Sequence, residues 1–202
     1  MEQVAIFGGS FDPIHIGHLW LAQQVYEIGG RVFKDDNYSH RDVKFDKLCI
    51  MPNFSGRSSG KIVTGAEHRL TMCKLALQDI NQNFGFPEPV KDLEIQQEFE
   101  YTYQTIDFLC RADYISFVWI ISSDWDVTKF KNYDELKTKC KFFIVHRPGE
   151  NDERYGDVRN FLPINIKLSS TQIRDRVKNG KSISGLVTPS VEKYIIDKGL
   201  YK

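Results

Sequence analysis

Short apolar runs alternate with helical patterns along most of the chain. Val4–Phe7 is typical of a buried strand, and after a glycine-containing turn the apolar positions 19, 22, 25 and 26 recur at the spacing of a helix. Further strand-like runs follow at Leu48–Met51, Val90–Ile95, Ile115–Ile121, Phe142–Val145 and Ile164–Leu168. Such alternation predicts a fold of the α/β class: a doubly wound, open parallel sheet of Rossmann-like type with helices on both faces.

Capping residues mark several helix boundaries. Thr64 with Glu67 is typical of a capping box at the start of one helix, and a second helix is predicted over Thr102–Arg111. Near the end of the chain, Thr188 followed by proline begins a helix that Gly199 ends. The C-terminus is therefore predicted to be packed against the rest of the protein.

The length of 202 residues, 41% of them hydrophobic, suits a single domain over 1–202 with a small C-terminal helical part at about 169–202. The stretches 31–44 and 54–65 are polar or rich in glycine and serine, which predicts irregular segments. Neither stretch has the features of a linker between two domains.

Charge and cysteine usage narrow the class of protein. Lysine plus arginine and aspartate plus glutamate both number 27, so the formal charge is zero, which disfavours nucleic acid and membrane surfaces as partners. The N-terminus lacks a signal-peptide pattern, and the four cysteines are far apart without metal-binding spacing. These features predict a cytoplasmic protein with reduced thiols, and they leave self-association into a homo-oligomer open.

The segment with the clearest chemistry is the turn from Gly8 to His18, between the first predicted strand and helix. Gly8 and Gly9 lack a Cβ, so backbone N–H groups there can approach phosphate oxygens, and the helix N-terminus adds further donors. This placement favours a polyphosphate ligand. The turn lacks the GxGxxG pattern, and the segment 56–61 is one residue short of a Walker A loop.

His15 and His18 are three residues apart, so their rings are predicted to project from one side of the first helical turn and to donate hydrogen bonds to phosphate. Two other interpretations are open. The pair could bind zinc, although no third ligand stands at a recognisable spacing, so no metal site is predicted. The rings could also serve only capping and packing.

Two later segments carry candidate ligand-binding groups. Ser169 to Arg174 follows the last apolar run, where the hydroxyl groups would cap a helix and Arg174 would emerge on its first turn. A cation is unfavourable at a helix N-terminus unless an anion binds nearby, although a solvated surface arginine is the alternative. Asp124 follows the run ending at Ile121 and could accept hydrogen bonds from ribose or cap the next helix.

These features, in this order, resemble the HxGH nucleotidyltransferase superfamily, and most closely the bacterial nicotinate mononucleotide adenylyltransferases of NAD synthesis. The resemblance covers nearly the whole chain and rests above all on Gly8–His18 and Ser169–Arg174. Weaker matches lie at His68-Arg69, Tyr101-Thr102, Asp124, Arg147–Gly149 and Tyr194–Tyr201.

The resemblance implies an ATP site and an acceptor site for a pyridine mononucleotide. Its ATP-binding residues would be Gly8, Gly9, Ser10, Phe11, His15, His18, Asp124, Ser170, Thr171 and Arg174. The residues facing the acceptor would be Tyr101, Thr102 and Tyr133. His15, His18 and Arg174 would be catalytic, and Mg²⁺ would arrive with ATP, held mainly by phosphates and water.

The chain departs from the family pattern mainly around the acceptor. Family members commonly carry a Pro-Pro-His-Lys loop after the second strand, where this chain has Met51–Phe54. The expected glycine before Asp124 is Ser122, and Asn132 stands where the family has a tryptophan that stacks on the pyridine ring. Adenylyl transfer is therefore predicted more firmly than the acceptor.

Alternative acceptors are nicotinamide mononucleotide and a phosphopantetheine-like molecule, and a different class of function is a non-catalytic nucleotide sensor. His15 to His18 also spells the HIGH signature of class I aminoacyl-tRNA synthetases, but those enzymes are much longer and carry a KMSKS loop that is absent here.

Overall fold

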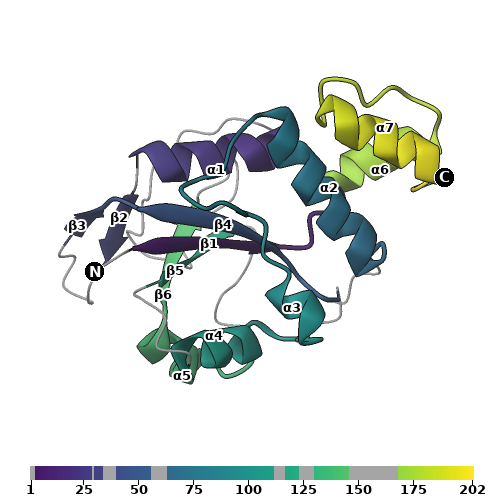
Figure 1. Cartoon of the computed structure of the whole chain (residues 1–202). Helices are drawn as coiled ribbons and strands as arrows, with labels where there is room; N and C mark the ends of the chain where they lie inside the picture. The colour runs from purple at the N-terminus through teal and green to yellow at the C-terminus, as the bar shows by residue number, and fades with distance from the viewer. Residues whose placement is uncertain are drawn as a thin grey trace.

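The computed structural model describes residues 3–28, 30–33, 40–55, 63–111, 117–122, 130–145 and 168–202. Its centre is a four-stranded sheet with the order β4-β1-β5-β6, in which every neighbouring pair is parallel (Figure 1). The strands are β1 (Val4–Gly9), β4 (Lys47–Pro52), β5 (Phe117–Ser122) and β6 (Lys141–Val145). The predicted parallel sheet and four of its runs are thus confirmed.

Helices cover both faces of the sheet, as predicted. In Figure 1, α1 (Ile16–Ile28) and α2 (Ala66–Asp79) lie on one face, and α3 (Leu93–Gln96), α4 (Thr102–Arg111) and α5 (Tyr133–Lys139) lie on the other. Side chains of the strands alternate between two buried clusters, with Ala5 and Phe7 on one side and Val4 and Ile6 on the other. This alternation follows from the two-residue period of a strand.

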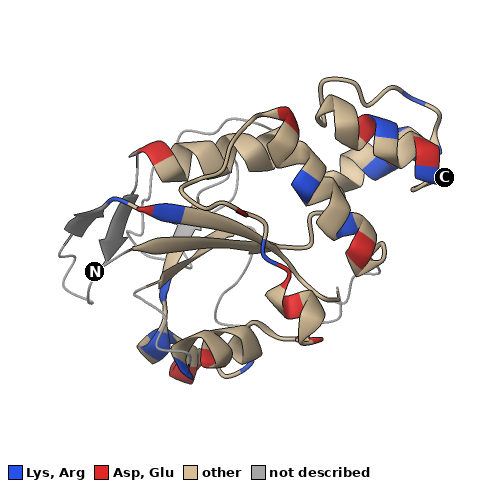
Figure 2. Ribbon diagram, viewed as in Figure 1, with Lys and Arg blue, Asp and Glu red and all other residues tan. Residues whose placement is uncertain are grey.

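In Figure 2 most of the blue and red positions fall on the helices, and β1 is tan along its length. The central strand β1 contains no charged residue. Buried strands of this kind are stabilised by burial of their apolar side chains on both faces. In the described part of the chain, no helix is both long and apolar enough to cross a bilayer.

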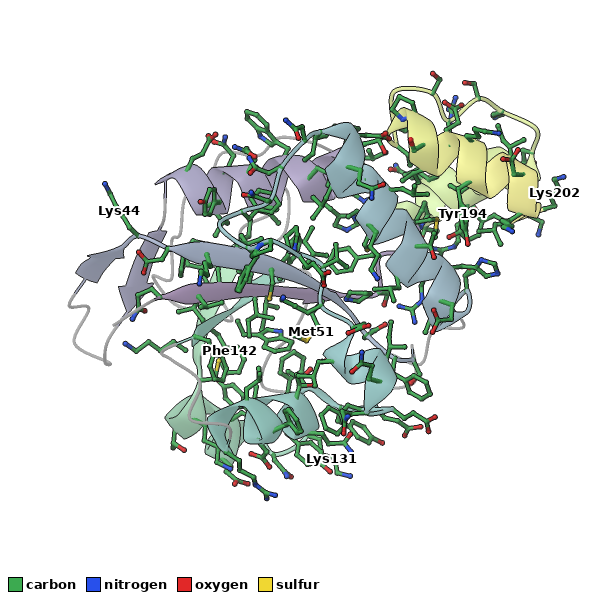
Figure 3. The ribbon with its side chains drawn as sticks, in the orientation of Figure 1. Lys44, Met51, Lys131, Phe142, Tyr194 and Lys202 are labelled. Atoms are coloured by element: carbon green, nitrogen blue, oxygen red, sulfur yellow. The ribbon has the colours of Figure 1, made fainter. Side chains whose placement is uncertain are left out.

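The C-terminal helices α6 (Ser170–Lys178) and α7 (Pro189–Lys198) pack beside α2 (Figure 1). Val191 and Ile195 of α7 are buried in the same hydrophobic cluster as α1 and α2. The expected boundaries of α7 are confirmed, because Pro189 is its first residue and Gly199 ends it in the left-handed conformation, with φ of 61°. Tyr194 of α7 also hydrogen-bonds His68 of α2 (2.9 Å), and Figure 3 shows Tyr194 between the two helices.

Two predictions of secondary structure are wrong. Val90–Ile95 forms no strand, because only Val90 makes a bridge, to Ile50, and the chain then turns into the short helix α3. The stretch 31–44 is not simply irregular: β2 (Gly30–Phe33) and β3 (His40–Val43) pair as a separate antiparallel ladder. The polar composition of this stretch gave no strand pattern, and the β2–β3 pair lies outside the main sheet.

The predicted capping box at Thr64 is also wrong, because Gly65 is the N-cap of α2 and makes no side-chain capping bond. The backbone of Thr64 is used elsewhere: its N–H donates to Asp12 (3.2 Å) and its carbonyl accepts from Arg69 (2.7 Å). By contrast, α4 has the predicted bounds. Residues 164–167 of the last predicted strand lie outside the described residues.

Candidate active site

The strand order reverses between β1 and β5, which places a switch point at their carboxyl ends. From β1 the chain proceeds outward to β4, and it then crosses back over β1 to reach β5 and β6. Ligands of open α/β sheets bind at such a point. The turn Gly8–His18 leaves β1 at this edge. Asp124, two residues after β5, lies outside the described residues.

Close packing explains why glycine occupies the beginning of the turn. A Cβ on Gly8 would lie 2.6 Å from Cζ2 of Trp119, and a Cβ on Gly9 would lie 3.1 Å from the ring of Phe11. Phe11 itself takes a left-handed conformation with φ of 47° and is only 2% exposed. Its side chain therefore belongs to the core, so only its backbone can face a ligand.

His15 and His18 form a reciprocal cap at the start of α1. His15 immediately precedes the helix, and the N–H of His18 donates to Nδ1 of His15 (3.3 Å) while the N–H of His15 donates to Nδ1 of His18 (3.2 Å). The rings stack with centroids 3.6 Å apart and planes inclined by 22°. This is the geometry of a capping box, built from two imidazoles.

The cap determines which nitrogen of each ring carries the proton. Because each Nδ1 accepts a backbone N–H, the proton of each neutral imidazole is placed on Nε2. The predicted common orientation of the two rings is confirmed, and the capping interpretation accounts for the Nδ1 atoms alone. An Nε2–H group of an imidazole is suited to donate to an oxygen atom of an anion. His15 is 2% exposed and His18 is half-buried, so His18 is the more accessible donor.

Helix α6 docks directly on this turn. Ser169 caps α6 in a capping box with Gln172, as its position in the sequence predicted. The hydroxyl of Ser170 donates to the carbonyl of Pro13 (2.9 Å), and Nη1 of Arg174 donates to the carbonyl of Asp12 (2.7 Å). Arg174 is the fifth residue of α6, which places it on the second turn of the helix and not on the first as expected.

The guanidinium of Arg174 also donates to the hydroxyl of Thr171 (3.1 Å), and its side chain is 31% exposed. The structure therefore brings Ser170, Thr171 and Arg174 to the same turn as the two histidines. A cation beside a helix N-terminus and two imidazole groups is the combination of charges and donors that an anion would require.

Asp12 connects the turn with three distant segments, and the sequence interpretation missed it. Asp12 is 3% exposed, and its carboxylate accepts from the hydroxyl of Tyr201 (2.7 Å) and the N–H of Thr64 (3.2 Å). Nη1 of Arg174 lies 3.9 Å from the same carboxylate. Partners up to 189 positions away cannot be inferred from local patterns.

Arg69, which the sequence placed only in a weak family match and without a role, is fully buried on α2. Its guanidinium donates five hydrogen bonds, to the carbonyls of Thr64, Ser10, Asn53 and Phe54 and to the side chain of Asn53, at 2.7 to 2.9 Å. Burial lowers its pKa and the nearby Asp12 carboxylate opposes that shift. The signal in the sequence was an arginine on the apolar side of a helix.

Asn53 occupies part of the loop that departs from the family pattern. Its N–H donates to the carbonyl of Gly9 (2.9 Å) and its side-chain amide donates to the hydroxyl of Ser10 (3.3 Å). Together with Arg69, Asn53 therefore fixes the backbone of the turn from the side of β4. No group of three His, Cys, Asp or Glu side chains suited to a metal ion occurs among the described residues.

The residues expected to face an acceptor lie at the N-terminal ends of α4 and α5, with Tyr101 directly before α4. Tyr101 and Tyr103 stack with centroids 5.9 Å apart, and Nζ of Lys131 lies 4.6 Å from the ring centroid of Tyr101. Figure 3 shows Lys131 below α4, on the sheet face opposite α1 and α2. Tyr133 begins α5, and Asn132 before it is exposed in the left-handed conformation, with φ of 62°, which asparagine tolerates well.

A buried carboxyl group lies beside this region. Glu94 of α3 is 6% exposed and accepts a hydrogen bond from the hydroxyl of Thr105 (2.6 Å). Burial raises the pKa of Glu94 to about 7, against the opposing effects of the Thr105 bond and the charge of Arg69. The sequence patterns gave no indication of this group.

Comparison with known proteins agrees with the geometry. Residues 6–176 match the family model described as cytidylyltransferase-like. The chain is 32% identical to the probable nicotinate-nucleotide adenylyltransferase of Hydrogenobaculum sp. (strain Y04AAS1), over 98% of this chain and 97% of that one. It is also 32% identical to the nicotinate-nucleotide adenylyltransferase of Bacillus subtilis (strain 168), over the full length of both.

Solved structures share the fold at lower sequence identity. A putative nicotinate-nucleotide adenylyltransferase from Vibrio parahaemolyticus superposes with a TM-score of 0.67 at 20% identity, covering 100% of this chain and 96% of that one. The Plasmodium falciparum nicotinic acid mononucleotide adenylyltransferase complexed with NaAD has a TM-score of 0.66 at 17% identity, covering 100% and 98%.

Proposed function

Because the chain belongs to the nicotinate-nucleotide adenylyltransferases, within the cytidylyltransferase-like family of nucleotidyltransferases, we propose that it transfers the adenylyl group of ATP to nicotinate mononucleotide. The products are the dinucleotide and pyrophosphate, which is a step of NAD biosynthesis. The observation that carries the proposal is the docking of Arg174 on Asp12 of the turn, because it unites the two segments with anion-binding chemistry in one site.

ATP would bind with its phosphates on the turn after β1. The Nε2–H groups of His15 and His18 would donate to phosphate oxygens, and the N-terminus of α1 would add backbone donors. Arg174 of α6 would close over the phosphates. Asp124 would bind the ribose of ATP. Mg²⁺ would arrive with ATP and be held mainly by phosphates and water.

The reaction would be a direct in-line displacement. A phosphate oxygen of the acceptor attacks the α-phosphorus of ATP, a new P–O bond forms, and the bond to the β-phosphate breaks as pyrophosphate leaves. The acceptor phosphate is ionised at neutral pH, so the step needs no general base. The protein would accelerate it by positioning both substrates and by stabilising negative charge with His15, His18 and Arg174.

The acceptor would bind on the other side of the switch point, near Tyr101, Thr102 and Tyr133. The ammonium group of Lys131 over the Tyr101 ring places a positive charge in this region. A cation interacts more favourably with the carboxylate of nicotinate than with the neutral amide of nicotinamide. This charge supports nicotinate mononucleotide as the preferred acceptor.

The proposal is tested by measuring pyrophosphate release from ATP and Mg²⁺ with nicotinate mononucleotide, nicotinamide mononucleotide or phosphopantetheine as acceptor. We expect the highest kcat/KM with nicotinate mononucleotide and formation of the dinucleotide. A preference for another acceptor would correct the substrate while retaining the chemistry. Binding of ATP without pyrophosphate release for any acceptor would refute catalysis and identify a nucleotide sensor.

A further inference from the structure

The end of the chain returns to the turn between β1 and α1. Tyr201, three residues after α7, donates a hydrogen bond from its hydroxyl to Oδ1 of Asp12 (2.7 Å), across 189 positions of sequence. Burial and the Asp12 carboxylate raise the pKa of Tyr201, so its hydroxyl stays protonated and able to donate. The contact links the C-terminus to the segment that carries His15 and His18.

The carboxylate of Asp12 could pair with Arg174 and so compete with a phosphate group for its guanidinium. It is nearly fully buried, and a buried carboxylate is stabilised by every donor within reach. Oδ1 accepts from Tyr201 and Oδ2 accepts from the backbone of Thr64. Arg174 instead donates to the backbone carbonyl of Asp12, with Nη1 remaining 3.9 Å from Oδ2.

We propose that Tyr201 is a positioning residue for ATP binding, because its hydroxyl occupies the Asp12 carboxylate and so keeps Arg174 available for the triphosphate. Arginine and carboxylate readily form a bidentate pair with two parallel hydrogen bonds. Without the Tyr201 hydroxyl, Oδ1 of Asp12 loses its donor, and the guanidinium of Arg174 already lies 3.9 Å from Oδ2 of the same carboxylate. A paired Arg174 would have to break from Asp12 before it could bind phosphate.

The inference rests on the proposed function only in that ATP is the ligand of Arg174. It is tested by equilibrium titration of the full-length protein with ATP and Mg²⁺ in the absence of acceptor. Tyr201→Phe removes one hydroxyl, and we expect the Kd for ATP to rise roughly tenfold, because the Arg174–Asp12 pair that then forms must break before ATP binds. Tyr194→Phe is the matched control, because Tyr194 contacts His68 and not Asp12.

A rescue experiment separates positioning from a general loss of structure. Asp12→Asn keeps an oxygen for the Thr64 N–H and removes the charge that would capture Arg174. In the Tyr201→Phe/Asp12→Asn double variant, the Kd should return to within about threefold of the Asp12→Asn value, because neutral asparagine cannot form the ion pair. A double variant as weak as Tyr201→Phe would overturn the inference, and so would equal weakening by Tyr194→Phe.

Asp12→Asn alone covers the case in which Tyr201→Phe does not fold. The inference expects this single variant to bind ATP at least as tightly as the wild type, and clearly weaker binding would overturn it. A wild-type protein that fails to bind ATP would refute the proposed function itself. Normal ATP binding by both the wild type and Tyr201→Phe would refute only the role of Tyr201.

Discussion

Replacing Glu94 with glutamine should change how the stability of the fold depends on pH. Glu94 is buried between α3 and α4, where burial raises its pKa from 4.5 to about 7. A raised pKa means that the folded protein holds this proton more tightly than the unfolded chain. The contribution to stability is therefore complete below about pH 4.5 and is lost as the pH rises through about 7.

The size of the effect follows from the shift. A pKa raised from 4.5 to about 7 amounts to roughly 3 kcal/mol, at about 1.36 kcal/mol for each tenfold change in proton affinity. A glutamine side chain at this position cannot ionise, and its carbonyl oxygen can still accept the bond from Thr105. We therefore expect Glu94→Gln to exceed the wild type in unfolding free energy by up to roughly 3 kcal/mol at pH 8, with little difference near pH 4.5.

Urea denaturation at pH 5 and pH 8 measures this difference. The exposed Glu98 in the same segment provides the control, because Glu98→Gln removes a carboxyl group that is not buried. If Glu94→Gln and the wild type lose the same unfolding free energy between the two pH values, Glu94 is ionised in the folded protein at pH 5 and the reasoning is refuted.

Three further variants test the site. His18→Ala should lower kcat by roughly 10² to 10³, the usual effect of removing one well-placed donor, and an unchanged kcat with a raised KM for ATP would make His18 a binding residue only. Arg69→Lys retains the charge but offers three donors to five acceptors, so urea denaturation should show a loss of about 3 kcal/mol, and an unchanged midpoint would contradict this role. Lys131→Gln should lower the ratio of kcat/KM for nicotinate over nicotinamide mononucleotide about two- to fivefold, and the same change in Lys139→Gln would show a non-specific effect of charge.

The fold was predictable wherever a strand is buried on both faces. Such strands are continuous apolar runs, and β1, β4, β5 and β6 each overlap a predicted run. Val90–Ile95 differs from these runs, because Lys91, Asp92 and Glu94 interrupt it, and only Val90 pairs with the edge strand β4. Composition reports burial, and Val90 is buried. It does not report whether a neighbouring strand edge is open for pairing.

The site was predictable in its local parts only. The reciprocal cap of His15 and His18 and the cap of α6 at Ser169 depend on residues three positions apart, so their spacing in the sequence is informative. The bonds of Asp12 to Thr64 and Tyr201 and the bonds of Arg69 to Ser10 join segments 52, 189 and 59 positions apart. Only the tertiary fold brings these groups together.

Arg69 and Arg174 both donate hydrogen bonds to the turn, but their surroundings give them different roles. Arg69 is fully buried, and all five of its N–H groups are used by acceptors of the surrounding loops, so it has no donor to offer a ligand. Arg174 is 31% exposed and holds the turn mainly by one short bond to a backbone carbonyl. A phosphate group can compete for Arg174 at small cost, whereas recruiting Arg69 would leave buried carbonyls without donors. Arg69 of α2 thus holds the turn in place, and Arg174 of α6 keeps the ability to bind a phosphate. A site that acts by positioning its ligand would need both properties.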